Sequence, residues 1–417
     1  MTPPHPEPDI RAEYERLVSG GAAEGERGRI LFYVSTTDLD EGKGDVYVAA
    51  GLAKHLARLG WGVDFRGVDR WTEAVPDGVD AIVAMLESFI PGHVPQEVRR
   101  VAWIRNWSRT WADLPFLEEY DEIWCSSEAS RAHLADRFRG PVAVLPIGVD
   151  ADLFRAERAT SRPHEVITTA NFWGVARELQ SAIAPLAARR SLTWYGANAG
   201  LAELPEGVHA RSRVAFFELP RVYAEAELVV DDLIPAAKEF GTHNSRLFEA
   251  IACGAIPIVN TREGLDELGL GAVPAYDSPE SLLAIADGLL DDPEGREQLR
   301  ESLRAVVTER HGYAARAEVA SERLEALRRR APADDAYERL LAWTTDLRED
   351  HRAADLALDH FRADAHEVGA ERNRLAGELE GTQRALDAAN SRLRQIEQSL
   401  PYRAWRRVRR LLPTGRR

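Results

Sequence analysis

Cysteine is scarce in this sequence, and no long hydrophobic run occurs in it. The 417 residues include only 2 cysteines, Cys125 and Cys253, far apart and in no metal-binding spacing. We therefore expect no disulfide framework, no structural zinc and no metal site. No segment approaches the ~20 apolar residues of a membrane-spanning helix, and the Pro-rich, charged N-terminus lacks the apolar core of a signal peptide. The sequence thus predicts a cytosolic protein.

Acidic residues outnumber basic ones over most of the chain. The formal net charge is −15, which argues against binding to nucleic acid. The balance is uneven, because residues 403–417 hold seven arginines and no acidic residue. What the chain does have is an ordinary apolar content of 45% and enough length for two domains of normal size.

Strands and helices alternate along most of the chain. We predict buried strands at residues 29–35, 62–66, 81–85, 100–104, 122–125 and 142–145, then at 166–170, 192–195, 228–231 and 255–259. Strands that alternate with helices form parallel sheets, so the pattern predicts an α/β protein with two Rossmann-like, doubly wound domains. A ligand cleft is expected where their carboxyl-edge loops face each other.

Changes in composition divide the chain into five parts. We expect a disordered leader at residues 1–27 with one short helix at 9–18, Rossmann-like domains at 28–154 and 155–330, a coiled-coil helix at 331–400 and a basic amphipathic tail at 401–417.

The coiled-coil prediction rests on a heptad repeat. An unbroken seven-residue register runs from Tyr337 to Leu400 and places Leu379, Leu386 and Leu393 in one position. Such a register predicts a homodimer, and a single long helix that folds back on the body is the alternative. The tail mixes arginine with Trp, Val and Leu, so it either lies on an anionic membrane surface or forms a disordered basic end.

The most informative part of the sequence is the segment at residues 243–259. It reads HNSRLFEAIACGAIPIV: a polar loop, a short helix, a glycine turn and an apolar strand. Such a helix opens at the carboxyl edge of a parallel sheet, where its N–H groups favour an anion such as a phosphate. Asn244 or Ser245 can cap the helix. Arg246 adds positive charge and Glu249 can accept hydrogen bonds from hydroxyl groups, although a capped helix that only packs on a sheet is an equal alternative.

A second segment, at residues 144–154, reads VLPIGVDADLF and ends the first domain. Together the two segments resemble the group-1 glycosyltransferases of the GT-B fold. This group is similar to glycosyltransferase family 4. That family ends its first domain with a Pro-x-Gly-Val-Asp turn and places a Glu-Ala-x-Ala-x-Gly-x-Pro-x-Val helix and strand at the donor site. The phrase NSRLFEA also resembles a branch tied to spore and surface polysaccharides. The similarity covers residues 29–325.

The resemblance implies a donor site in the second domain. Glu249 would bind the ribose hydroxyls of a nucleoside diphosphate sugar, with Asn244 and Ser245 beside it. Many relatives carry a second glutamate eight positions earlier, which orients the transferred sugar. Gly241 stands at that position here, so Glu239 is the nearest acid for this role.

Positive charge at the leaving diphosphate is the next requirement, because negative charge builds up there as the glycosidic bond breaks. Relatives supply an Arg and a Lys just after the first strand of the second domain. This chain offers Arg177 there, and Arg246 and Lys238 are the further candidates. The resemblance implies transfer with retention of configuration, no catalytic metal and no cofactor other than the nucleotide sugar itself.

In the first domain, a glycine-bearing loop at residues 42–47 follows the first strand, where the family has a glycine-rich loop. Gly44 would let the backbone approach the substrate closely. Asp45 would orient the acceptor as an acid or base, or else only cap the following helix.

A Trp-rich segment follows the fourth predicted strand. Trp103, Trp107 and Trp111 are four residues apart, which would place them on one helical face, and core packing is the default explanation. Relatives often have a cleft-facing histidine in this region. In this chain Arg105 and Asn106 occupy that region instead of a histidine. We therefore predict an acceptor platform made of Arg105, Asn106 and Trp107.

The sequence therefore predicts a nucleotide-sugar-dependent glycosyltransferase that acts on a glycan or lipid-linked acceptor in bacterial surface polysaccharide or glycoconjugate synthesis. It would be cytoplasmic, with its tail at the inner face of the plasma membrane if the tail binds lipid. The alternative is a non-catalytic scaffold of the same fold that acts through its coiled coil, because the paired glutamate and the lysine of the family are missing.

Overall fold

The computed structural model describes residues 9–171, 177–197 and 203–330, together with scattered positions between 344 and 394. The chain divides into a compact unit at Met1–Trp343 and a second unit at Thr344–Arg417. The described positions of the second unit are helical. Most of the predicted coiled coil and the whole basic tail lie outside the described residues, so these two predictions stay untested. Among the described helices, none combines the length and apolar character needed to cross a membrane.

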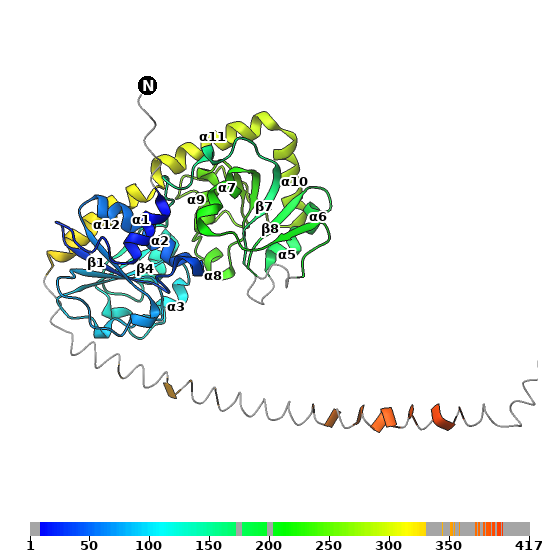
Figure 1. Cartoon of the computed structure of the whole chain (residues 1–417), viewed down its shortest axis with the longest axis horizontal. Helices are drawn as coiled ribbons and strands as arrows, with labels where there is room; N and C mark the ends of the chain where they lie inside the picture. Colours follow the sequence, from blue (N-terminus) through cyan, green and yellow to red (C-terminus); the bar gives the residue numbers. More distant parts are fainter. Residues whose placement is uncertain are drawn as a thin grey trace, which may run out of the picture. The chain divides into compact units, whose positions relative to one another are not determined.

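The first domain contains a parallel sheet of six strands in the order β2-β1-β3-β4-β5-β6 (Figure 1). Its strands are β1 Arg29–Tyr33, β2 Gly62–Arg66, β3 Ala81–Ala84, β4 Arg99–Ile104, β5 Glu122–Cys125 and β6 Val142–Val144. Side chains on β1 alternate between two cores, with Ile30 and Phe32 on one face and Leu31 and Tyr33 on the other. A sheet buried on both faces explains why the strands read as continuous apolar runs.

The second domain contains a parallel sheet of five strands in the order β11-β10-β7-β8-β9. Its strands are β7 His164–Thr168, β8 Leu192–Tyr195, β9 Val208–Arg211, β10 Ala226–Val230 and β11 Ile256–Ile258. The two predicted groups of strands are thus confirmed, with small differences at their ends. The sequence did not indicate β9, because this edge strand is mostly exposed and lacks an apolar run.

Helices cover both sheets. They are α1 Ile10–Val18, α2 Gly44–Arg58, α3 Ser108–Ala112, α4 Glu128–Ala135, α5 Glu178–Ala182, α6 Ala184–Ala187, α7 Leu219–Ala224, α8 Pro235–Lys238, α9 Ser245–Ala252, α10 Pro279–Asp291, α11 Pro293–Arg310 and α12 Tyr313–Arg328. Short 3-10 helices are η1 Leu39–Glu41, η2 Val68–Arg70, η3 Pro91–His93, η4 Leu117–Glu119, η5 Ala156–Arg158 and η7 Phe216–Glu218.

Helix α1 corrects the prediction of a disordered leader at residues 1–27. The predicted short helix is present, and Asp9 caps it by accepting a hydrogen bond from the N–H of Ala12 at 3.1 Å. Tyr14 and Leu17 are buried in the core of the first domain. From residue 10 onward the segment therefore belongs to the fold, because its apolar face is covered. The sequence pattern alone could not show that this face has a packing partner.

Helix α12 corrects the predicted boundary of the second domain at residue 330. It packs against α2 of the first domain (Figure 1). Gly51 of α2 permits this close approach, since a Cβ there would lie 2.5 Å from the ring of Tyr313. Trp61 donates a hydrogen bond from Nε1 to Ser321 Oγ at 2.9 Å. The second domain therefore ends before α12, and the last helix returns to the first domain.

Candidate active site

A cavity of about 530 Å³ lies between the two α/β domains, and we call it the interdomain cavity. The first domain contributes α1, the loop after β1 and the start of α2 to its lining. The second domain contributes loops that follow β7 and β8, the segment at residues 213–219, and the first turn of α9. Loops at the carboxyl ends of parallel strands thus line the cavity, as expected for a doubly wound fold.

Helix α9 carries the predicted donor residues into the cavity. Asn244 caps the helix by accepting a hydrogen bond from the N–H of Arg246 at 2.9 Å. Gly254 ends the helical segment with a φ of 78°, in the left-handed region that favours glycine. Asn244, Ser245, Arg246 and Glu249 all line the cavity. The structure therefore brings these four predicted residues together at one cavity.

Glu249 is buried, not solvated. Its exposed fraction is 6%. Burial raises the pKa of Glu249 to about 7, although Ser245 and Arg246 act in the opposite direction. Near neutral pH this carboxyl group therefore exists in both protonation states, and it can either donate or accept a hydrogen bond to a ligand hydroxyl.

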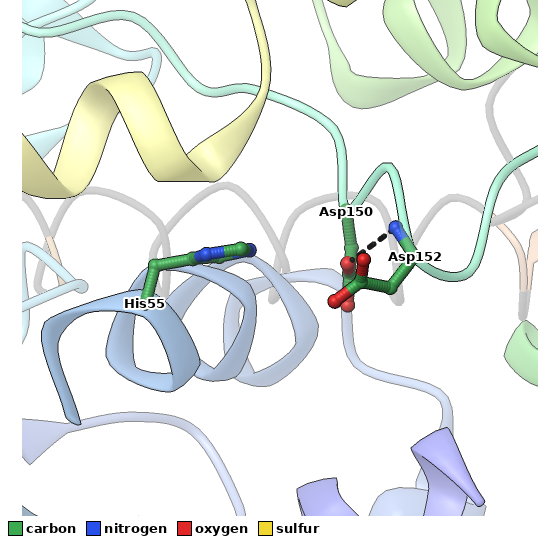
Figure 2. A group of neighbouring side chains, drawn as sticks. All are labelled: His55, Asp150 and Asp152. Carbon is green, nitrogen blue, oxygen red and sulfur yellow. Dashed lines mark hydrogen bonds between the residues drawn. The ribbon is translucent and has the colours of Figure 1, made fainter. Parts of the chain in front are cut away.

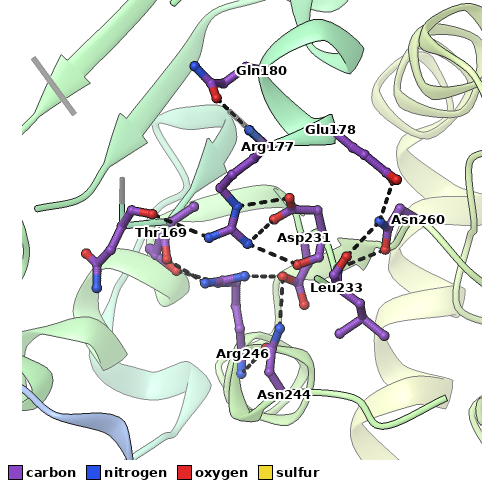
Figure 3. Close-up of polar contacts among 12 residues, drawn as sticks. Thr169, Arg177, Glu178, Gln180, Asp231, Leu233, Asn244, Arg246 and Asn260 are labelled. Carbon is purple, nitrogen blue, oxygen red and sulfur yellow. Dashed lines mark hydrogen bonds and ion pairs between the residues drawn. The ribbon is translucent and has the colours of Figure 1, made fainter. Parts of the chain in front are cut away.

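Arg246 lines the cavity but already has partners. Its guanidinium forms an ion pair with Asp231 and donates to Thr169, from Nε to Oγ1 at 2.8 Å and from an amino group to the carbonyl at 2.6 Å (Figure 3). Burial lowers the pKa of Arg246, but the Asp231 carboxylate outweighs burial and the net shift is upward. This cation is held in one orientation.

Arg177 has a similar arrangement but does not belong to the residues that line the cavity. It pairs with Asp232, from Nε to Oδ2 at 3.0 Å and from an amino group to Oδ1 at 2.5 Å (Figure 3). Asp231 and Asp232 both follow β10, so one strand end supplies a counter-charge to each predicted phosphate-binding arginine. Sequence reasoning missed this pair of acids, although two adjacent aspartates after a buried apolar strand were a visible signal.

Lys238 and Glu239 do not line the cavity. Lys238 Nζ lies 3.3 Å from Glu178 Oε2. Glu239 forms an ion pair with Arg109 of the first domain. Both side chains are engaged in ion pairs outside the cavity lining, so the donor role predicted for each stays a prediction.

In the first domain, Gly44 lines the cavity but Asp45 does not. Asp45 is the second residue of α2, and its carboxylate accepts hydrogen bonds from Ser35, from N at 2.6 Å and from Oγ at 2.7 Å. Lys43 occupies the N-cap position. The prediction that Asp45 caps α2 is therefore wrong, whereas its role as an acceptor-orienting acid or base stays a prediction.

The three tryptophans do not share a helical face. Trp103 belongs to β4, Trp111 belongs to α3, and Trp107 lies between them with a φ of 62°. Trp103 and Trp111 are buried, whereas Trp107 is 45% exposed. Arg105, Asn106 and Trp107 do not line the interdomain cavity. The helical prediction failed because a β-strand and a turn interrupt the four-residue spacing.

An aromatic wall of the cavity was not predicted. Tyr47 of α2 stacks on Phe216 of η7, with ring centroids 3.8 Å apart and an angle of 9° between the planes. Tyr14 and Phe217 meet edge to face at 5.6 Å. These rings come from both domains and are far apart in sequence, so no local pattern could have indicated them.

Arg213 also contributes to the cavity, and it too was not predicted. It donates hydrogen bonds to the carbonyl groups of Asp40 at 2.9 Å and Glu41 at 2.5 Å. A residue of the second domain thus binds the C-terminal end of η1 in the first domain. Arg213, Asp40 and Gly42 all line the cavity.

A possible cation site among the described residues is the group His55, Asp150 and Asp152 (Figure 2). Lys54 already binds both carboxylates of this group, because its Nζ lies 2.7 Å from both oxygens of Asp150 and 2.9 Å from Asp152. Burial lowers the pKa of His55 to about 4. A metal ion here would have to displace a buried ammonium group, so the arrangement fits a structural ion pair and not a metal site.

Comparison with known proteins agrees with this architecture. Residues 175–322 match the family model described as glycosyl transferase-like. Sucrose-phosphate synthase from Thermosynechococcus elongatus is 14% identical, with a TM-score of 0.54 and coverage of 72% of this chain and 98% of that chain. Anabaena HepE in complex with UDP and glucose is 12% identical, with a TM-score of 0.54 and coverage of 71% and 99%.

WaaG, a glycosyltransferase involved in lipopolysaccharide biosynthesis, is 14% identical, with a TM-score of 0.51. The match covers 71% of this chain and 99% of that chain. At these identities the structural likeness shows the fold. No curated protein sequence matches the chain. The chain thus has the GT-B fold of these structures, and residues 175–322 are similar to a glycosyl transferase-like family.

Proposed function

We propose that this enzyme transfers a sugar from a nucleoside diphosphate sugar to a glycan or lipid-linked acceptor in bacterial surface polysaccharide or glycoconjugate synthesis. The observation that carries the proposal is the buried Glu249 in the first turns of α9, which lines the interdomain cavity beside Asn244 and Arg246. The solved structure of HepE, which shares the fold, contains UDP and glucose. A nucleotide sugar is therefore the ligand that we assign to this cavity.

Arg246 is the residue that we assign to the leaving diphosphate. It lines the cavity, and the N–H groups at the start of α9 lie beside it. We propose that the diphosphate competes with Asp231 for this guanidinium, and that Arg177 supports the site from behind. Fixed cations and a helix N-terminus can stabilise developing negative charge without a metal ion. We further propose transfer with retention of configuration.

A scaffold without catalytic activity is the second candidate. The ion pairs of Arg246 with Asp231 and of Arg177 with Asp232 favour it, because each neutralises a cation that phosphate would need. The two candidates differ in one respect that can be measured, which is whether a donor binds and turns over.

Thermal-shift measurements with a panel of nucleoside diphosphates and nucleotide sugars test the proposal. We expect one nucleoside diphosphate to raise the melting temperature, because a ligand that binds only the folded state stabilises it. Arg246→Lys should weaken that binding about 10- to 100-fold, since lysine cannot reproduce the bidentate contacts of the guanidinium. Arg221→Ala, on the exposed surface of α7, should leave binding unchanged. A panel that produces no shift would favour the scaffold.

We also propose that residues 331–400 form a homodimer and that the basic tail binds anionic lipid at the inner membrane face. A chain that ends at Arg330 keeps α12 and should remain folded and bind the donor, because α12 completes the first domain. It should be a monomer by light scattering and should not bind anionic vesicles. If this shortened chain is still dimeric, the coiled-coil prediction is wrong. If the full-length chain does not bind anionic vesicles at low salt, the tail is only a basic end.

A further inference from the structure

Arg105 is a cation without a protein partner in the first domain. It follows β4 at the carboxyl edge of the sheet, and its side chain is half-buried. Its Nε is buried and has no hydrogen-bond partner, and no ion pair within the described ranges includes its guanidinium. Arg100, on the same strand, is different, because it forms an ion pair with Glu119 at 3.2 Å.

The acidic residues in electrostatic range of Arg105 do not neutralise it by contact. They are Asp45 and Glu87. Both oxygens of Asp45 accept hydrogen bonds from Ser35. Although burial lowers the pKa of Arg105, a guanidinium keeps its charge at any pH that a protein meets. A charge that is partly removed from water without a partner destabilises the folded state, and an anion that binds beside it would recover part of that energy.

The backbone next to Arg105 is strained. Trp107 is the one non-glycine residue with a positive φ in the described part of the chain, at 62°. A bulky residue rarely adopts this conformation, and such residues concentrate at functional sites. Its ring is 45% exposed, although large apolar rings are usually covered. An exposed aromatic face therefore stands two residues from the unpaired cation.

Tyr313 links this region to the interdomain cavity. It lines the cavity and lies within electrostatic range of both Glu249 and Arg105. On the other side, the ion pair between Arg109 and Glu239 joins α3 to the second domain. Arg105 therefore lies on the first-domain side of the junction, close to the cavity but not in its lining.

We propose that Arg105 binds an anionic group, a phosphate or a carboxylate, on the acceptor, while the exposed ring of Trp107 packs against a sugar of that acceptor. The proposal rests on the transferase function proposed above and narrows its acceptor to an anionic glycan or a phosphate-linked lipid. Both sources present the same negative charge to the guanidinium. Arg105 acts in this scheme as an acceptor-binding residue and does not touch the donor.

Arg105→Gln is the test variant, and Arg131→Gln is its matched control. Arg131 is exposed on α4 and pairs with Glu128 at 2.6 Å. Without ligand, Arg105→Gln should melt at the same temperature as the wild type or higher, because it removes a half-buried charge that has no protein partner. A large fall in melting temperature would show that Arg105 has a structural partner and would overturn the proposal.

The binding measurement uses the full chain with its best nucleoside diphosphate bound, so that the donor site is filled. Inorganic phosphate and glucuronate are then titrated at constant ionic strength. At least one of them should raise the melting temperature of the wild type and of Arg131→Gln, with an affinity about 10- to 100-fold weaker in Arg105→Gln. A response to phosphate points to a phosphate-linked acceptor, and a response to glucuronate points to an acidic glycan. Equal responses in all three proteins, or none, overturn the proposal.

Donor hydrolysis separates this inference from the proposed function. Arg131→Gln, at an exposed position of α4 outside both sites, should bind and hydrolyse the nucleotide sugar in water as fast as the wild type. If no nucleoside diphosphate binds, the transferase proposal fails, and the phosphate titration still reports on Arg105. If donor binding and hydrolysis are normal but phosphate and glucuronate do not distinguish the variants, only the inference about Arg105 fails.

Discussion

Replacing Lys54 with methionine should lower the free energy of unfolding by about 3–5 kcal/mol, because it leaves a buried carboxylate without its counter-charge. Lys54 is fully buried, and its ammonium group lies 2.7 Å from both oxygens of Asp150. Asp150 is 1% exposed and also accepts a hydrogen bond from Tyr14 at 3.0 Å. Urea denaturation followed by circular dichroism measures the effect.

Two further variants make the test specific. Arg58→Ala, which removes the exposed partner of Asp152, should cost only about 0.2–1 kcal/mol. The double variant Lys54→Met with Asp150→Asn should recover part of the loss, since both members of the buried pair are then neutral. If Lys54→Met is no more destabilising than Arg58→Ala, the ion pair does not support the turn after β6.

The second large effect concerns Glu249 and depends on pH. The folded-state pKa of Glu249 is raised from 4.5 to about 7. Below pH 4.5 the carboxyl group is protonated in both the folded and the unfolded state, so folding does not bury a negative charge. Between about pH 4.5 and pH 7 the unfolded state loses the proton first, so the stability of the fold declines as pH rises through this range. Above it, the ionised Glu249 costs on the order of 3 kcal/mol.

Glu249→Gln removes this titration. The variant should be more stable than the wild type at pH 8, by up to about 3 kcal/mol, and nearly equal to it at pH 4.5. Glu280→Gln, at an exposed position of α10, is the control and should show no such pH dependence. Chemical denaturation at both pH values gives the comparison. If the free energy of unfolding differs between Glu249→Gln and the wild type by the same amount at both pH values, Glu249 is not buried in its ionised form.

A gain in stability at the expense of binding would support the proposed role of Glu249. Functional sites often keep groups that destabilise the fold, and their replacement stabilises the protein while activity falls. We therefore expect Glu249→Gln to weaken nucleoside diphosphate binding at the same pH at which it stabilises the chain. Higher stability together with weaker ligand binding distinguishes a ligand-binding carboxyl group from a buried acid that takes no part in binding.

The sequence by itself determined the fold class and the helix and strand within residues 243–259. Apolar β-branched runs between helical periods define parallel strands, and glycines at strand and helix ends mark the turns between them. The order of residues 243–259 placed Asn244, Arg246 and Glu249 at the start of one helix, where they line the cavity. These features follow from local geometry, because spacing along the chain sets which side chains share a face.

Only the tertiary structure decided which charged side chains have an oppositely charged partner. Arg246 and Arg177 are predicted phosphate ligands, yet the two aspartates that follow β10 pair with them. Arg105, in contrast, has no such partner among the described residues. Ion pairs join residues that are distant in sequence, so residue type predicts the charge but not its neutralisation.

The same reason explains the errors at the ends of the domains. Helix α1 was predicted as a helix but not as part of the core, and α12 was assigned to the wrong domain. Whether an amphipathic helix is covered depends on which surface lies opposite it, and that surface here is α2, far away in sequence. Local pattern specifies a helix, whereas its packing partner is chosen by the shape and area of the whole fold.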